Sequence, residues 1–352
     1  MATRLSLKKL ALIALPAFAL AACGDQGGDA SASRNYISAV GSSTVYPFAN
    51  VAAEAFAAAN AGMRTPKIES TGTGGGIERF CAGMGAATPD IANASRRMKA
   101  KEFAACAANG VTDIVEIQIG IDGIALGEAT AGPGFALTQE DIYKALAANP
   151  YGQPNTARTW HDVNPALPNV AISVFGPPST SGTYDAFKEL ILGKGCEANP
   201  AMKALKDSNK DQYEANCHTL RGAPEYVEQG ENDNLIVQKL VQNPTSLGIF
   251  GYSYLDANRA QIRDVPVAGV EATAATIANG TYPGSRPLFI YVKKAHIGVI
   301  PGLGQYIAAF VQQAAPGGAL SRRGLIPLGA DLYAASTAAV TQLPLLRADD
   351  LK

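Results

Sequence analysis

The run GSSTVYPF, residues 41–48, lies between a short apolar stretch and an alanine-rich one. Residues 36–40 are strand-like and residues 49–61 are helix-like, so the run occupies a strand-to-helix junction. Serine and threonine at such a junction can accept hydrogen bonds from the unpaired N–H groups of the first helical turn and cap the helix. Alternatively, these N–H groups stay free for an anion, which the helix dipole also attracts. This first turn, residues 42–44, does not decide between the two by itself.

Strand-like and helix-like segments alternate along the rest of the chain. Strands are expected at 37–40, 67–70, 90–94, 113–126, 169–175, 247–252, 262–267 and 287–292. Helices are expected at 45–60, 76–84, 101–108, 138–148, 183–192, 233–242, 272–279 and 303–314. This alternation predicts an α/β fold with parallel-rich sheets, which bind ligands at the carboxyl ends of their strands. Residues 149–168 and 195–232, rich in Pro, Asn and charge, are expected to be surface connections.

Two further junctions repeat the chemistry of the first turn. The second turn is STGTGGG, residues 70–76, and the third turn is STSGT, residues 179–183. Glycine lets the backbone approach a ligand closely, and hydroxyl groups are compact donors. Three such turns that converge would form a cage for one small oxyanion. Arg96 follows the strand at 90–94 and is expected to bind the oxyanion through two hydrogen bonds from its planar guanidinium group. Arg97 is expected to be solvated.

Size, charge and missing motifs exclude several classes of function. The 352 residues suffice for two lobes with separate cores. The 29 Lys and Arg nearly balance the 30 Asp and Glu, which argues against a nucleic-acid partner. The sequence lacks GxSxG, GxxxxGK[ST] and HExxH, so nothing indicates a serine hydrolase, a P-loop ATPase or a zinc protease. An exported phosphatase or hydrolase is the alternative among enzymes, and a structural surface lipoprotein is a third class; we expect no enzyme, cofactor or metal ion.

The first 23 residues have the features of an export signal. Three basic residues precede an apolar run at residues 10–22, which is too short to span a membrane. The run ends in LAAC, residues 20–23, which resembles a bacterial lipobox and implies lipidation of Cys23; an ordinary signal peptide is the alternative. Residues 24–35 are expected to form a flexible tether. We therefore expect a periplasmic protein that contacts the membrane only through a lipid anchor.

Four cysteines remain after Cys23, and an even number in an exported protein suggests disulfides. Three pairings are open, of which the local pairs Cys81–Cys106 and Cys196–Cys217 are favoured. Each would close a loop of about 20 to 25 residues and stabilise the fold by on the order of 3 kcal/mol. A zinc site at Cys217 and His218 is the alternative, but no CxxC spacing supports it.

Several motifs together resemble the periplasmic phosphate-binding proteins of Pst-type ABC importers. They are GSSTVYPF (41–48), ESTGTGGGIERFCAG (69–83), TPDIANASR (88–96), TSGTYDAF (180–187), YPGSRPLFIYV (282–292) and GLIPL (324–328). The resemblance implies a two-lobed type II periplasmic-binding fold that closes on the anion. Lobe 1 would comprise residues 36–117 and 256–346, and lobe 2 residues 118–255. The implied protein is a monomer that delivers inorganic phosphate to an ABC permease; a receptor for another tetrahedral oxyanion (sulfate, molybdate or a phosphonate) is the alternative.

The resemblance also implies a set of ligand contacts. These are the Ser43 hydroxyl, the Thr44 backbone N–H, Thr73 with Gly74, Arg96, and Ser181, Gly182 and Thr183.

Two positions depart from the family's pattern. Tyr184 stands where many relatives have an arginine that contacts the ligand, and Arg96 stands where some have an aspartate that accepts the proton of hydrogen phosphate. The proton acceptor must then be another acid. Asp185, Glu231 and Asp233 are candidates, and Asp185 is favoured because it lies just inside the third turn, where it could equally well stabilise the helix dipole.

Overall fold

The computed structural model describes residues 34–179, 181–230 and 233–351. The expected signal, nearly all of the tether, Cys23 and the candidate acid Glu231 lie outside the described residues. All of the described residues belong to one compact unit.

The described strands form one hydrogen-bonded network in the order β2-β1-β3-β9-β4-β7-β5-β6, with β8 paired to β4. Their bounds are Ser38–Gly41 (β1), Lys67–Ser70 (β2), Ile91–Ala94 (β3), Ile114–Ala129 (β4), Val174–Gly176 (β5), Tyr226–Glu228 (β6), Leu247–Gly251 (β7), Ile262–Asp264 (β8) and Ser285–Lys293 (β9). β1 lies between β2 and β3 and is parallel to both, and β5 is parallel to β6 and β7. β9 is antiparallel to β3 and β4. The fold is therefore mixed α/β, with antiparallel pairing that the βα alternation did not predict.

Strand β4 connects the two groups of strands. Its residues 114–123 pair with β9, and its residues 124–128 pair with β7. At 16 residues it is much longer than an average strand. Because β4 is continuous, one backbone segment joins the strands around β9 to the strands around β7.

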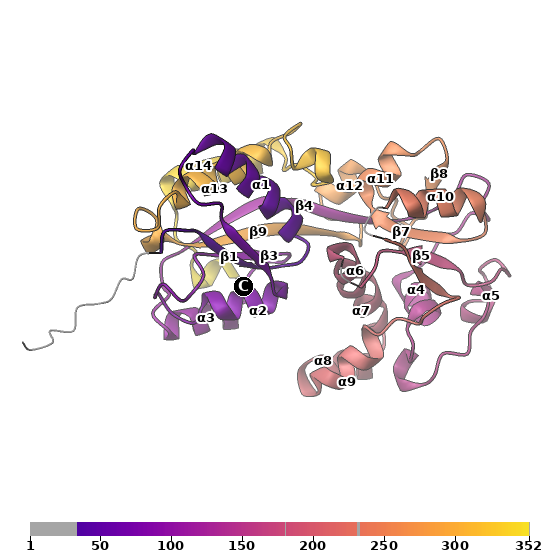
Figure 1. The fold of residues 1–352 in the computed structure, drawn as a ribbon. Coiled ribbons are helices and arrows are strands. Elements are labelled where there is room, and N and C mark those ends of the chain that lie inside the picture. The colour runs from indigo at the N-terminus through magenta and orange to yellow at the C-terminus, as the bar shows by residue number, and fades with distance from the viewer. Residues whose placement is uncertain (1–33, 180, 231–232, 352) are drawn as a thin grey trace, which may run out of the picture. The chain divides into compact units, whose positions relative to one another are not determined.

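Helices cover the strands on both faces (Figure 1). Their bounds are Tyr46–Ala59 (α1), Gly72–Phe80 (α2), Ala100–Ala108 (α3), Gln139–Leu146 (α4), Trp160–Val163 (α5), Gly182–Phe187 (α6), Gly193–Cys196 (α7), Pro200–Ser208 (α8), Lys210–Cys217 (α9), Asn234–Gln242 (α10), Tyr252–Ala257 (α11), Ala274–Ala278 (α12), Leu303–Gln313 (α13) and Ala330–Gln342 (α14). A π-helical turn, Lys188–Leu192, joins α6 to α7.

The buried apolar residues form three clusters. In β9, Leu288, Ile290 and Val292 belong to a cluster with α1 and α13, whereas Phe289 and Tyr291 belong to a cluster with α2 and α3. This alternation follows from the period of two in a strand. The largest cluster draws its residues from 121–282, with Leu328. This cluster also includes residues after 255, where lobe 2 was expected to end. The division of the chain into lobes stays a prediction.

Several helices, among them α11 and the short α7, and one strand were missed in segments expected to be loops or not assigned. α8, α9 and β6 lie within 195–232, α5 lies within 149–168, and α14 follows the last expected helix. No residue of α8 is buried, and five of the eight residues of α9 are charged or amide, so neither helix presented a clear buried apolar face. α2 begins at Gly72 rather than at residue 76. Gly76 is required by close packing, because a Cβ there would lie 2.3 Å from the Gly41 Cα.

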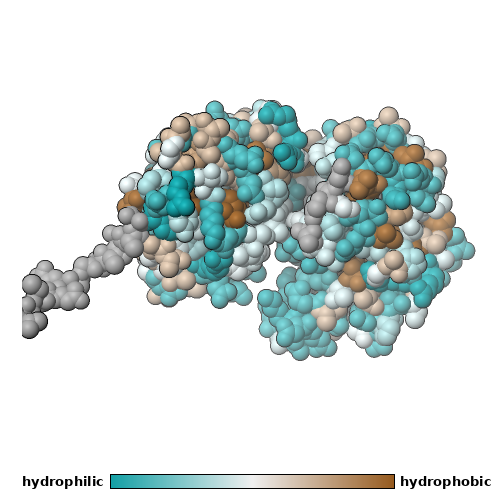
Figure 2. Space-filling view, in the orientation of Figure 1, coloured by the Kyte–Doolittle hydropathy of each residue, from teal (hydrophilic) through white to brown (hydrophobic). Residues whose placement is uncertain are grey.

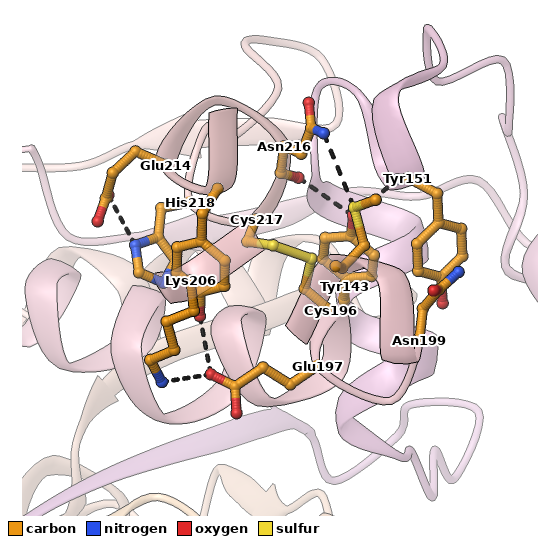
Figure 3. Close-up of a disulfide and its surroundings, with 12 residues drawn as sticks. Tyr143, Tyr151, Cys196, Glu197, Asn199, Lys206, Glu214, Asn216, Cys217 and His218 are labelled. Carbon is orange, nitrogen blue, oxygen red and sulfur yellow. Dashed lines mark hydrogen bonds and ion pairs between the residues drawn. A yellow bond between two sulfur atoms is a disulfide. The ribbon is translucent and has the colours of Figure 1, made fainter. Parts of the chain in front are cut away.

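Two disulfides join local segments in the pairing that the sequence favours. Cys81 is bonded to Cys106, which links the end of α2 to α3, and Cys196 is bonded to Cys217, which links α7 to α9. Beside the second disulfide, Glu197 accepts hydrogen bonds from Lys206 at 2.5 Å and from the Tyr213 hydroxyl at 2.9 Å (Figure 3). The disulfide and these contacts hold the α8–α9 pair to the rest of the chain. The zinc alternative at Cys217 is wrong, because its sulfur is bonded to Cys196.

Within the described ranges, no helix combines the length and the apolar character needed to cross a membrane. The face in Figure 2 shows apolar residues in small groups among hydrophilic ones, which is ordinary for a folded protein surface.

One carboxyl group should make the free energy of unfolding depend on pH. Burial raises the pKa of Asp264 to about 6, and its Oδ2 atom accepts a hydrogen bond from the Ala272 N–H at 3.0 Å. The pKa in the unfolded chain is about 3.9, so folding favours the protonated form. The free energy of unfolding should therefore fall as the pH rises from about 4 to about 6.

We expect Asp264→Asn to raise the free energy of unfolding at pH 7.5 by about 1 kcal/mol, allowing for partial solvent screening, and to leave it nearly unchanged at pH 3.5. Urea unfolding at the two pH values measures the difference. Asp113→Asn, at an exposed position, is the control and should have no such effect. Equal effects of Asp264→Asn at both pH values would contradict the prediction.

Candidate functional site

The first turn follows β1 at a point where only glycine fits. Gly41 has a φ of +139°, and a Cβ there would lie 2.1 Å from the Asn93 carbonyl oxygen on β3. The Ser42 hydroxyl oxygen accepts from the Val45 N–H at 3.3 Å, a contact within the turn before α1, whose N-cap residue Val45 has no side-chain cap. The two residues after Ser42 are directed elsewhere. The first turn thus contains one hydroxyl group that is bonded within the turn and two that point away from α1.

Those two hydroxyl groups contact α6, which begins at the third turn. The Ser43 hydroxyl donates to Asp185 Oδ2 at 2.6 Å, and the Thr44 hydroxyl donates to the Gly182 carbonyl oxygen at 3.2 Å. A Cβ at Gly182 would lie 2.6 Å from the Thr44 Cα, so the two backbones touch. The first and third turns, more than 130 residues apart in the chain, therefore meet.

The third turn is organised by its own serine. The Ser181 hydroxyl oxygen accepts from the Thr183 N–H at 3.2 Å and caps α6. With Asp185 in the first turn of α6, hydroxyl, N–H and carboxylate groups lie within a few residues of each other.

The second turn lies at the same edge of the sheet as the first. The Thr73 hydroxyl lies 2.9 Å from the Ser95 hydroxyl, and its oxygen accepts from the Ser95 N–H at 3.0 Å. Because β1 is parallel to β2 and β3 and lies between them, the residues that follow all three strands share one edge. A Cβ at Gly74 would meet nothing within 4 Å.

Arg96 forms an ion pair instead of pointing into a cavity. Its guanidinium donates to both carboxylate oxygens of Glu102, at 2.9 and 2.7 Å. Burial tends to raise the pKa of Glu102, but hydrogen bonds from Arg96 and from the Lys99 backbone N–H outweigh it and lower that pKa. Arg97 is paired with Glu116, to which its Nε and Nη2 atoms donate.

The first and third turns line a cavity of about 450 Å³. Ser43, Thr44 and residues 181–183 contribute hydroxyl and backbone groups to its wall, and Tyr254 and Arg323 line it as well. The candidate acid Asp233 also lines the cavity, and its Oδ2 atom accepts from the Gly251 N–H at 3.0 Å. Thr73, Gly74 and Arg96 are not among the lining residues. Of the predicted contacts, the structure thus brings together those of the first and third turns.

Two residues beside the cavity were missed in the sequence. Arg286 on β9, only 4% exposed, donates to the Thr44 hydroxyl oxygen, to Glu189 Oε2 at 2.8 Å and to Asp122 Oδ2 at 3.4 Å. Burial raises the pKa of Asp122, which lines the cavity, while the charge of Arg286 opposes that rise. The available signal was an arginine inside the apolar run YPGSRPLFIYV, residues 282–292.

Nothing in the described residues gathers as a metal site, since no three His, Cys, Asp or Glu side chains come together there. His296 contacts the buried Asp90 at 2.6 Å, and His218 contacts Glu214 at 2.8 Å. Neither of these pairs includes a hydroxyl group. The donors at the cavity are suited to holding an anion by hydrogen bonds.

The chain is similar to known proteins over most of its length. The family model of the PBP superfamily domain matches residues 28–313. The chain is 31% identical over 341 residues to Protein SphX of Synechococcus elongatus. The matched residues cover 93% of this chain and 88% of that protein. It is 30% identical over 283 residues to the phosphate-binding protein PstS of Staphylococcus saprophyticus. Here the matched residues cover 78% of this chain and 76% of that protein.

Solved structures are similar over most of the chain. A "possible phosphate binding protein" from Planctomyces limnophilus has a TM-score of 0.72 at 28% identity, covering 87% of this chain and 98% of that one. An ABC-type phosphate transport receptor from Vibrio cholerae has a TM-score of 0.56 at 19% identity, covering 83% and 100%, and supports the fold alone.

Proposed function

The chain belongs to the PBP superfamily, and on this premise we propose that it is a receptor that captures inorganic phosphate outside the cytoplasm and delivers it to an ABC-type permease. The family is one of binding proteins, so the chain is a receptor and not an enzyme. The observation that carries the proposal is the meeting of the first and third turns at one cavity.

Donors at the two turns would hold the anion. The Thr44 hydroxyl is already engaged, because it donates to Gly182 and accepts from Arg286. We therefore assign the backbone N–H of Thr44 to the anion, together with the residues Ser181, Gly182 and Thr183. The Ser43 hydroxyl, which donates to Asp185 in this structure, would exchange that carboxylate for the anion. Uncharged donors of this kind can replace the hydration shell of a small oxyanion.

Thr73, Gly74 and Arg96 complete the proposed cage. They follow the two strands on either side of β1, which supports the assignment although they do not line the cavity. To bind the anion, Arg96 would exchange the Glu102 carboxylate for it, since both offer two oxygens to the same planar fork. Arg96 would then add a positive charge to the cage besides that of Arg323, which lines the cavity.

Asp185 is the proposed acceptor of the phosphate proton. Its Oδ2 atom already accepts from Ser43 at 2.6 Å, so the carboxylate lies at the contact between the two turns. A carboxylate at that place would repel sulfate, which carries no proton at neutral pH, and accept a hydrogen bond from hydrogen phosphate. Asp233, at the cavity wall, is the alternative acceptor, and a receptor for another tetrahedral oxyanion is the alternative function.

The cellular setting is proposed from the sequence alone. Export, lipidation of Cys23, a periplasmic location, a monomeric state and the division into lobes at 117, 255 and 346 all stay predictions.

Phosphate should stabilise the protein, and sulfate should do so far less. Ligand at about 1,000 times its Kd adds about 4 kcal/mol to the free energy of unfolding. Asp185→Asn should raise the affinity for sulfate by at least ~10-fold, because it removes a charge that repels that anion. Thermal unfolding and titration calorimetry with both anions provide the measurement.

The matched control is Asp331→Asn, which removes another first-turn acid, that of α14. It should leave the preference between the two anions unchanged. Equal stabilisation of the wild type by phosphate and sulfate would contradict the phosphate assignment.

Loss of Arg96 should weaken phosphate binding strongly. Hydrogen bonds to a charged group contribute about 1.5–3 kcal/mol each, and a bidentate contact makes two, so Arg96→Ala should cost at least ~100-fold in affinity. Arg96→Lys should recover only part of it, because an ammonium group has no planar fork. Arg97→Ala should stay within about twofold, as expected for an exposed ion pair. Calorimetric titration of the three variants decides, and wild-type affinity in Arg96→Ala would exclude Arg96 from the cage.

A further inference from the structure

Arg286 is a buried cation at the meeting point of the two turns. It lies near the start of β9, directly opposite Asp122 on β4, and is only 4% exposed. A buried guanidinium is costly unless its donors find acceptors. The acceptors that Arg286 finds come from three different segments of the chain.

Those acceptors connect β9 to the first turn, to β4 and to the segment after α6. They are the Thr44 hydroxyl oxygen, Asp122 Oδ2 at 3.4 Å and Glu189 Oε2 at 2.8 Å. Glu189 belongs to the π-helical turn that continues α6. Arg286 thus contacts one partner just before α1 and another just after α6.

The contact with Thr44 has a fixed direction. A guanidinium only donates, so the Thr44 oxygen accepts from Arg286, and the single hydroxyl hydrogen is left for another acceptor. That acceptor is the Gly182 carbonyl oxygen at 3.2 Å. The result is a directed series of two hydrogen bonds, from Arg286 to Thr44 and from Thr44 to Gly182.

These two hydrogen bonds control how the donors of the first and third turns face each other. With its hydroxyl committed in both directions, Thr44 has one orientation relative to the start of α6. The absence of a side chain at Gly182 lets the two backbones touch there. Without Arg286, the Thr44 hydroxyl could rotate and the contact would lose its charged member.

We propose that Arg286 is a positioning residue of the anion site, which acts through the Thr44 hydroxyl to hold the first turn against the third turn. This inference rests on the proposed function, because it assigns Arg286 a part in phosphate binding. It differs from the role proposed for Arg96, since Arg286 does not touch the anion. A residue that acts through Thr44 should lose its effect when the Thr44 hydroxyl is absent.

A double-mutant cycle measured by titration calorimetry with inorganic phosphate tests this dependence. Arg286→Gln and Thr44→Val should each weaken phosphate binding by at least ~10-fold. The double variant should be no more than about threefold weaker than the weaker single variant, because both changes break one chain of hydrogen bonds. Thr44→Ser keeps the hydroxyl and should bind within about threefold of the wild type.

Arg263→Gln is the matched control for loss of an ion pair. Arg263 on β8 is bound to the buried Glu128 at 2.9 Å, so its replacement removes the cationic partner of a buried carboxylate, which keeps the backbone N–H groups of Gly134 and Phe135. This variant should melt at a lower temperature, yet bind phosphate within about twofold of the wild type.

Three outcomes would overturn the inference while leaving the proposed function intact: a folded Arg286→Gln variant with wild-type affinity, a double variant weakened by the product of the two single effects, or equal losses of affinity in Arg263→Gln and Arg286→Gln. Should Arg286→Gln fail to fold, wild-type affinity in Thr44→Val would overturn it as well. A wild-type protein that does not bind phosphate would overturn both the inference and the proposed function.

Discussion

The contact between the Thr44 backbone and Gly182 sets the geometry of the site. A Cβ at Gly182 would lie 2.6 Å from the Thr44 Cα, so this approach requires glycine. Two hydrogen bonds accompany it, from Ser43 to Asp185 and from Thr44 to the Gly182 carbonyl. A buried arginine then holds the same threonine from β9. The cavity, its donors and the buried ion pair all lie around this single backbone contact.

The chemistry of the site combines neutral donors with nearby carboxylates. Hydroxyl and N–H groups would favour any small oxyanion, whereas Asp185 beside them would disfavour one that brings no proton. Burial further raises the pKa of Asp122 at the cavity wall, opposed by Arg286. Discrimination among anions would therefore come from carboxylates as much as from donors.

The sequence predicted most of the elements around the site, because their strands and helices show clear periodicity. β2 was predicted with its observed bounds, and α1 and α3 within one residue at each end. α8 and α9 were not predicted, since α8 buries no residue and α9 is mostly charged or amide. Antiparallel pairing of β9 with β3 and β4 is a long-range property that local patterns do not encode. For the same reason, the motif around residue 286 was recognised without its contact to Thr44, 242 residues away.

A crystal structure of the protein grown with inorganic phosphate tests the central claim most directly. We expect phosphate oxygens within hydrogen-bonding distance of the Thr44 N–H and of Ser181 or Thr183, with Asp185 beside the protonated oxygen. Phosphate bound away from these two turns, or no bound phosphate at a concentration that saturates binding in solution, would contradict the claim.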